Sequence, residues 1–253
     1  MFKKIKGHFL IISIVFLFFL FWPPENVFAS FKEEFNNGSL SESEKWEILD
    51  ENNFLQYTAT SFYFTAPVGS MFPYMFTKTS IFPENSDFKL DLKFKFDNQA
   101  YLSEYNFGSG IRVTNNVQLE RTNYEIPQGD DIFSIWPSTN ETFRLHANIP
   151  RQDGVCTSCS VWTAAGEDYY NYHNIEIGYK NRVYQIFIDD VLKFTSAPTD
   201  IRPKFIWLGN PVQLTNTVKW SKFQIDYIRI SKPGSPPLVL LPGLGASWNT
   251  EAM

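Results

Sequence analysis

Aromatic and polar side chains gather in the middle third of the chain, where the regular alternation of apolar and charged residues breaks down. Flat rings can stack on the C–H face of a sugar while amide and carboxyl groups hydrogen-bond to its hydroxyls. Core or loop packing is the alternative role for the tryptophans here, and a structural hydrogen bond is the alternative for the histidine. Six residues are our candidate ligand-binding side chains: Trp136, Trp162, Tyr169, Tyr170, Tyr172 and His173.

The chain has two cysteines, Cys156 and Cys159, in the run Cys-Thr-Ser-Cys. A local disulfide is favoured if the chain is exported, and free thiols or redox and metal chemistry are the alternatives. A loop this short stabilises by roughly 2 kcal/mol in the chain-entropy model, so the bridge would pin a turn. A zinc site would need His146 or His173, and neither stands at finger-like spacing from the cysteines.

Carboxylates could supply acid–base chemistry, but their spacing places no pair on one face of a strand. Glu120 and Glu125 are five residues apart and would face opposite sides of a continuous strand. Residues 130–131 and 167–168 are adjacent acidic pairs typical of loops, and Glu176 stands between two isoleucines on a polar face. We expect solvated charges and no catalytic set.

The first residues carry an export signal. Three lysines in the first six residues precede an apolar run over residues 9–22, and residues 27–29 suit a signal peptidase. We expect a secretory signal peptide over residues 1–29, cleaved after Ala29, with an uncleaved membrane anchor as the alternative. The protein is therefore expected to be secreted or held at the cell surface or in the periplasm.

Composition narrows the possible partners. The chain has 25 Phe, 12 Tyr and a net charge of -5. Binding to nucleic acid needs clustered Lys and Arg, which the sequence lacks, so we exclude that class of partner. Residues 30–232 are enough for a single core, and Trp46, Trp207 and Trp220 are expected to pack in it.

Apolar and charged residues alternate with a period of two through most of the chain after residue 30. In residues 88–96, Phe and Leu alternate with Lys and Asp, which turns one apolar face inward and one charged face outward. Short polar connections at residues 180–181 and 189–190 predict hairpins. We expect an all-β antiparallel sandwich, preceded by a signal helix and followed by an irregular C-terminal tail. The same alternation recurs in residues 143–149, 172–179, 182–189 and 223–230.

Several runs resemble landmarks of the concanavalin A-like lectin and glucanase superfamily, whose domains are jelly rolls. The superfamily includes lectins, laminin-G-like adhesion modules, hydrolases and lyases, so the resemblance implies the fold and leaves function open. It also implies that Ca²⁺ is possible, although no residue can be named for it. The Glu-x-Asp pattern of its β-glucan hydrolases is absent. The runs are residues 31–35 (FKEEF), 45–47 (KWE), 184–189 (YQIFID), 202–211 (RPKFIWLGNP) and 223–230 (FQIDYIRI).

The last residues resemble the opening of a different fold. An apolar run over residues 238–241 followed by Pro242 and Gly243 is similar to the first strand and oxyanion loop of lipase-like α/β-hydrolases. The resemblance implies that Leu244 matches the oxyanion-loop position, whereas Ser247 lacks the nucleophile elbow. We interpret residues 233–253 as a linker and the truncated start of such a domain. The alternative is a tail that packs on the preceding domain.

Together these features predict an exported, non-catalytic jelly-roll module that binds carbohydrate or a related cell-envelope ligand. It would hold the lipase-like domain near its substrate and so raise the effective concentration there. A divergent glycoside hydrolase or polysaccharide lyase is one alternative. An adhesion or structural module that acts through an apolar surface patch is the other.

Overall fold

The structure is a computed structural model of the chain, and part of the chain is described in it. The expected signal peptide, residues 1–29, lies outside the described part, as does almost all of the expected hydrolase start. No helix in the described part has the length and apolarity needed to cross a membrane. The described residues are 30–35, 40, 43–50, 53, 55–57, 62–64, 74–96, 110–115, 131–138, 142–156, 158–165, 170–209 and 223–233.

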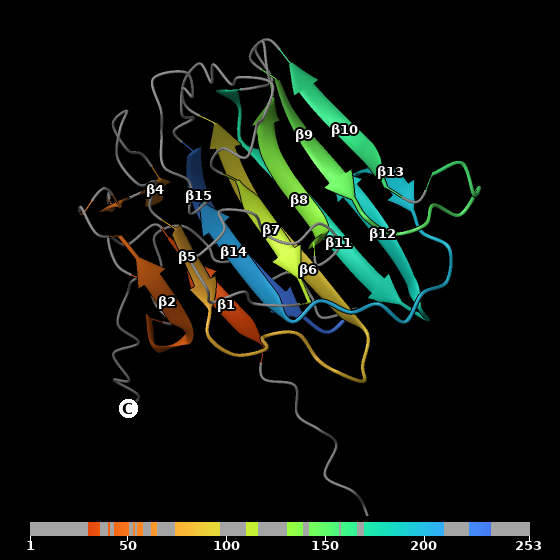
Figure 1. Ribbon diagram of the computed structural model, residues 1–253, viewed down its shortest axis with the longest axis horizontal. Coiled ribbons are helices and arrows are strands. Elements are labelled where there is room, and N and C mark those ends of the chain that lie inside the picture. The colour runs from red at the N-terminus through yellow and green to blue at the C-terminus, as the bar shows by residue number, and fades with distance from the viewer. Residues whose placement is uncertain are drawn as a thin grey trace, which may run out of the picture.

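The described strands form two antiparallel sheets that stack face to face (Figure 1). Sheet A has eight strands in the order β13-β12-β11-β6-β15-β4-β3, with β1 also paired to β15. Sheet B has seven strands in the order β10-β9-β8-β7-β14-β5-β2. The 3-10 turn η1 (Ser43–Lys45) directly precedes β2. The predicted all-β antiparallel sandwich is confirmed.

The strand bounds follow for each sheet. Sheet A consists of β1 (Phe31–Glu34), β3 (Gln56–Tyr57), β4 (Phe62–Phe64), β6 (Phe88–Phe96), β11 (His173–Lys180), β12 (Val183–Ile188), β13 (Val191–Thr195) and β15 (Phe223–Ser231). Sheet B consists of β2 (Trp46–Leu49), β5 (Tyr74–Thr77), β7 (Ile111–Thr114), β8 (Asp131–Ser138), β9 (Thr142–Ala147), β10 (Cys159–Ala165) and β14 (Phe205–Gly209).

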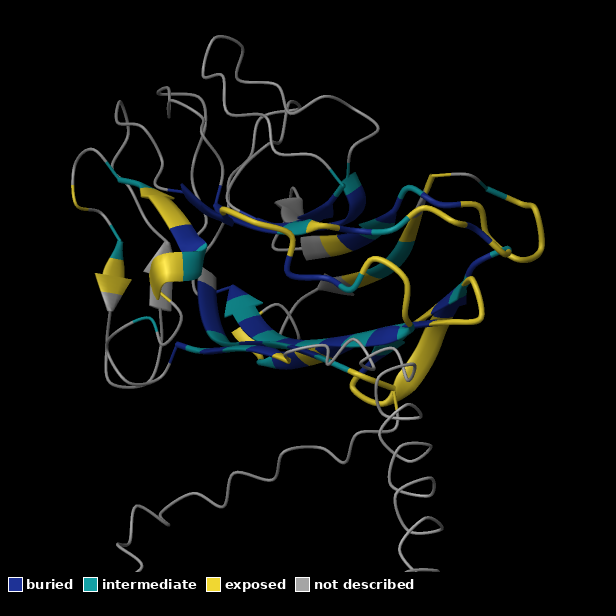
Figure 2. Cartoon of the chain, turned by 90° about the horizontal axis from the view of Figure 1, so that it is seen from below, coloured by how far each residue is buried: buried dark blue, intermediate teal, exposed yellow. Residues whose placement is uncertain are grey.

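The alternation in the sequence explains the two layers. Buried and partly buried residues alternate along all nine positions of β6, as the pattern of residues 88–96 predicts. Figure 2 shows the two layers with buried residues along both, and buried residues from both sheets form one core cluster. Across this core the ring of Phe133 in β8 meets Tyr184 in β12 edge to face, with centroids 5.1 Å apart.

Two tight turns set the register of β11, β12 and β13. Asn181 and Arg182 both have positive φ, 52° and 67°, and Asp189 and Asp190 have 48° and 65°. Two successive residues in this region give the type I′ geometry whose twist matches that of paired strands. The second predicted hairpin is confirmed, while the first turns one residue later than expected, at residues 181–182 and not 180–181.

A carboxylate ties the two sheets together at the β1 end. Glu33 of β1 is fully buried, and Trp46 Nε1 of β2 donates a hydrogen bond to Glu33 Oε2 at 3.1 Å. The rings of Phe31 and Phe35 pack on the same tryptophan, with centroids 6.0 Å and 6.3 Å from it. The bond matters because a buried carboxylate that loses a donor keeps its full desolvation penalty.

We predict that Trp46→Phe lowers the free energy of unfolding by about 1–3 kcal/mol more than Trp207→Phe does. The two tryptophans are 2% and 3% exposed, so the volume lost is matched. Only Trp46 loses a hydrogen bond, because Trp207 Nε1 has no hydrogen-bond partner within the described structure. Urea denaturation measures both values, and equal losses would contradict the role assigned to Glu33.

Alkaline pH should destabilise the fold through buried tyrosines. Burial raises the pKa of Tyr184, whose hydroxyl donates to the carbonyl of Ile201 at 2.7 Å, and burial also raises the pKa of Tyr227. A tyrosine in the unfolded chain loses its proton near about pH 10, so the folded state holds more protons above that pH. The free energy of unfolding therefore falls as the pH rises past about 10. Tyr184→Phe should make this fall less steep in urea titrations at several pH values, and an unchanged slope would count against it.

Candidate functional site

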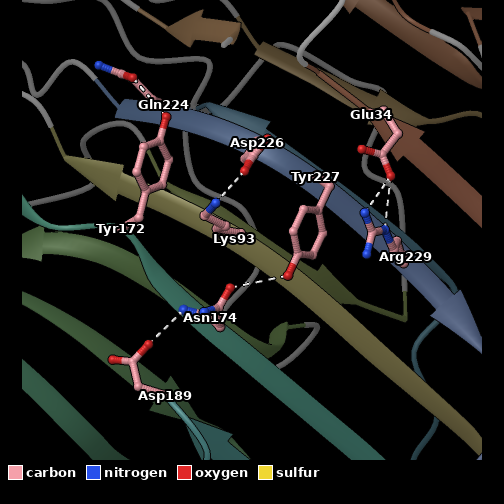
Figure 3. Close-up of polar contacts among 9 residues, drawn as sticks. All are labelled: Glu34, Lys93, Tyr172, Asn174, Asp189, Gln224, Asp226, Tyr227 and Arg229. Atoms are coloured by element: carbon pink, nitrogen blue, oxygen red, sulfur yellow. Dashed lines mark hydrogen bonds and ion pairs between the residues drawn. The ribbon is translucent and has the colours of Figure 1, made fainter. Parts of the chain in front are cut away.

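The outer face of sheet A is a solvated polar ladder, as the sequence predicts. Lys93 pairs with Asp226 at 2.7 Å and Arg229 pairs with Glu34 at 2.7 Å, and Figure 3 shows these contacts along neighbouring strands. The guanidinium of Arg229 also lies 4.0 Å from the ring centroid of Tyr227. Charges on this face are largely paired with one another, which is the usual state of the wet side of an antiparallel sheet.

The outer face of sheet B is different, because polar groups on it are buried. Strand register places Trp207 of β14 opposite Arg112 of β7, Arg112 opposite Ser134 of β8, and Ser134 opposite His146 of β9. Their neighbours along the strands, such as Leu208 in β14, pack into the core between the sheets. The four residues therefore form a row across the outer face, about 14 Å long from the spacing of strands. We call it the polar row.

Aromatic side chains close one end of the polar row. Tyr74 and Phe76 of β5 stack on Trp207, with ring centroids 5.7 Å and 4.7 Å away. All three residues are at most 6% exposed and form a cluster separate from the main core. Trp207 was expected to be a core residue. It is buried, but in this second cluster on the outer side of the sheet.

A buried ion pair occupies the middle of the row. Arg112 Nη1 lies 3.2 Å from Asp131 Oδ2, and the two side chains are 11% and 14% exposed. Asp131 reaches this position because the register between β7 and β8 shifts next to Thr114. Burial lowers the pKa of Arg112, and the charge of Asp131 opposes that shift. An arginine remains protonated at neutral pH, so Arg112 is a hydrogen-bond donor whose charge is compensated by Asp131 and whose position on the sheet is fixed by the ion pair.

His146 provides a neutral ring at the far end. Burial lowers the pKa of His146, the charge of Arg144 lowers it further, and a hydrogen bond with Asn148 acts in the opposite direction. The imidazole is therefore uncharged at neutral pH, and one nitrogen donates while the other accepts.

Two buried polar atoms of the row lack hydrogen bonds. Ser134 is 1% exposed, and its Oγ has no hydrogen-bond partner among the described residues. Trp207 is 3% exposed, and its Nε1 has no hydrogen-bond partner there either. Each such atom disfavours folding by about 1–3 kcal/mol unless a water or ligand satisfies it. Buried unpaired groups on one face point to a site where another molecule supplies the missing bonds.

The row lacks the acid pair that glycoside hydrolysis needs. Among the residues of the sheet B strands, the carboxylates are Glu47 in β2 and Asp131 in β8. Four strand spacings separate β2 from β8 in the sheet, or about 19 Å, whereas catalytic carboxylates stand about 5–10 Å apart. The described strands of sheet B therefore provide donors and acceptors for binding without a nucleophile and acid pair.

The calcium site that the superfamily resemblance made possible finds no support in the described residues. No group of three or more His, Cys, Asp or Glu side chains there could hold a metal ion. We derive no metal-dependent step.

Of the six candidate residues predicted from the sequence, the described ones lie on both sides of sheet A. Trp162 of β10 and His173 of β11 do meet, edge to face with centroids 4.8 Å apart, but at the edge of the sandwich interior. His173 is 5% exposed, and its Nδ1 lies 2.7 Å from Asp189 Oδ2. Tyr172 lies on the other side of sheet A, where its hydroxyl donates to Gln224 and Lys93 covers its ring (Figure 3).

The remaining predicted residues are placed only in part. Tyr170 is exposed, at 36%. Trp136 pairs with Arg144 in register, but its side chain lies outside the described residues, as do Tyr169, Trp220 and Leu244. Cys156 is disulfide-bonded, and the side chain of Cys159 also lies outside the described part.

Sequence reasoning missed the polar row. Arg112 and Ser134 look like ordinary residues of a wet strand face, so nothing in their pattern separates them from exposed positions. The usable signal was in β14, where apolar residues run without a break from Phe205 to Leu208. Such a run indicates a strand buried on both faces.

Comparisons with known proteins bear on the fold. No family model and no curated protein matches the chain. The crystal structure of the Emp47p carbohydrate recognition domain has a TM-score of 0.54 at 13% identity, and the match covers 82% of this chain and 96% of that chain. A structure described as a native glycosidic hydrolase has a TM-score of 0.50 at 12% identity, covering 83% and 99%.

At these identities the likeness shows the fold alone. The chain shares the antiparallel two-sheet, jelly-roll-like sandwich of these two structures. The jelly-roll fold that the sequence resemblance implied is thus confirmed. The resemblance of the last residues to an α/β-hydrolase has no support in these comparisons.

Two buried serines test whether the Ser134 hydroxyl of the polar row stabilises the fold. Ser134 and Ser196 are each 1% exposed, but only Ser196 Oγ accepts a bond, from the backbone N–H of Tyr184 at 2.8 Å. We predict that Ser196→Ala lowers the free energy of unfolding by about 1–2 kcal/mol, while Ser134→Ala leaves it level or raises it, because that change removes an unsatisfied buried hydroxyl. Equal losses in urea denaturation would show that the Ser134 hydroxyl is structural.

Proposed function

We propose that the protein is an exported carbohydrate-binding module whose ligand lies on the outer face of sheet B. One observation carries the proposal: within the described residues, Ser134 Oγ and Trp207 Nε1 are buried without hydrogen bonds on a face that strand alternation would leave to water. A polyhydroxylated ligand both donates and accepts, so its hydroxyls can pair with Ser134 Oγ and with the indole N–H of Trp207.

The charges of the row favour a neutral sugar. Arg112 is compensated by Asp131, and His146 is uncharged at neutral pH because burial lowers its pKa. An anionic ligand would have to compete with Asp131 for the guanidinium, whereas neutral hydroxyls can bond to its remaining N–H groups. The ring of Tyr74 stacks on Trp207 and holds the indole at the end of the row.

The module is proposed to bind without cleaving. Glu47 and Asp131, the carboxylates of the described sheet B strands, stand too far apart for either glycosidase geometry. In the wider proposal it is the accessory domain of a lipase-like hydrolase, which it would hold near a polymer or envelope surface. The link to a hydrolase rests on the sequence of residues 233–253, and export rests on the sequence of residues 1–29.

A glycan microarray followed by calorimetry tests the proposal. We predict binding to at least one neutral oligosaccharide and a loss of affinity of about ten-fold in Trp207→Phe and in Ser134→Ala. Trp207→Phe keeps an aromatic ring in the stack but removes the N–H donor together with part of the indole ring system. Ser196→Ala is the control, because that hydroxyl lies away from the row in the core and should leave affinity unchanged.

Two results would overturn the proposal that carbohydrate binds on the outer face of sheet B. The first is the absence of binding to any glycan on the array, and the second is binding that neither row variant weakens. Release of new reducing ends from the bound oligosaccharide would instead support a glycoside hydrolase.

A further inference from the structure

The opposite face of the sandwich holds a hollow that the proposed site does not use. It lies on the outer side of sheet A over strands β6, β11 and β12, with a volume of about 410 Å³. Gly178 of β11 forms its floor, between Lys89 of β6 and Gln185 of β12 in register. The hollow exists because the central strand has no side chain at that position.

Gly178 is not required by the backbone. Its φ lies outside the positive region, and a Cβ added there would meet only the carbonyl oxygen of Gln185, at 4.0 Å. A glycine inside a strand disfavours folding by roughly 0.5–1 kcal/mol relative to alanine, and often marks a place where a ligand approaches closely. The visible effect of this glycine is to keep the hollow open.

The lining of the hollow mixes apolar and polar side chains. Phe187 and Val183 of β12, with Pro233 after β15, provide apolar surface, while Gln185 provides an amide. Lys89 Nζ lies 3.1 Å from Glu176 Oε2 and 3.1 Å from Asp91 Oδ1, so its ammonium group is compensated, and Lys180 adds a second cation to the lining. The lining therefore offers hydrogen-bond donors and acceptors beside apolar surface.

We propose that this hollow is a second carbohydrate site, which takes a single neutral pyranose. The C–H face of the sugar packs on Phe187 and Val183, and the hydroxyls of the sugar bond to Lys89, Glu176 and Gln185. A module with sites on both outer faces can contact two segments of one polymer, or two chains, and so gain avidity without a larger interface.

A backbone NMR titration of the full chain tests the hollow directly. The probes are three neutral sugars, the methyl pyranosides of mannose, glucose and galactose, each taken to tens of millimolar because single-sugar sites bind at about millimolar Kd. We expect at least one of them to shift the amide signals of Gly178, Gln185 and Phe187 saturably.

Gly178→Val is the decisive variant, because it places a branched side chain that favours strands on the floor of the hollow, where a Cβ meets only the carbonyl oxygen of Gln185 at 4.0 Å. It should weaken the saturable shifts by at least about ten-fold while the thermal midpoint stays level or rises. Phe187→Ala removes the apolar wall instead and should weaken binding as well. Lys95→Gln, on the same outer face in β6 but outside the hollow, should bind as the parent chain does.

The same spectra distinguish binding in the hollow from binding at the polar row. Shifts at Arg112, Ser134 and the indole of Trp207 report the polar row, whatever happens at Gly178. The inference is overturned if none of the three sugars shifts the Gly178, Gln185 and Phe187 amides saturably. It is also overturned if Gly178→Val keeps the parent affinity.

Discussion

The structure depends on one constraint, which is that strands such as β6, β11 and β12 each give one face to the core between the two sheets. Strict alternation along β6 and the cross-sheet contact of Phe133 with Tyr184 are its clearest expressions. Because inward residues must meet inward residues, the pairing register is fixed, and a slip of one residue would expose the whole apolar set. The same register then fixes which side chains share the outer face, so Trp207, Arg112, Ser134 and His146 form a row as a consequence of core packing.

Three features depart from what stability alone would select, and all lie on outer faces. Ser134 Oγ and Trp207 Nε1 are buried without hydrogen bonds in the described structure, although alanine and phenylalanine would avoid that penalty. Gly178 leaves a gap in a strand that a valine could fill. By contrast, the buried carboxylate of Glu33 is bonded to Trp46, and the buried Ser196 hydroxyl to the backbone of Tyr184. Departures of this kind are expected where a protein keeps groups for a ligand.

The sequence predicted the layers better than the site. Period-two alternation in residues 88–96 and 223–230 predicts strands with one buried face. The strand β6 follows it throughout, while a bulge between Ile225 and Tyr227 interrupts it in β15. The polar row was not predicted because the sequence pattern of an arginine and a serine on a polar strand face is the same whether they are solvated or buried. Conversely, the aromatic residues near His173 were grouped by sequence proximity, yet Tyr172 and His173 point to opposite sides of β11 because successive side chains alternate.

The account is tested most directly by a crystal structure of the protein soaked with the neutral oligosaccharide that binds it best on an array. We predict sugar density across the polar row, with hydroxyl oxygens within about 3.2 Å of Trp207 Nε1 and Ser134 Oγ. Density for the sugar only elsewhere on the molecule, with these two atoms still lacking a bound partner, would contradict the claim that the outer face of sheet B is a binding face.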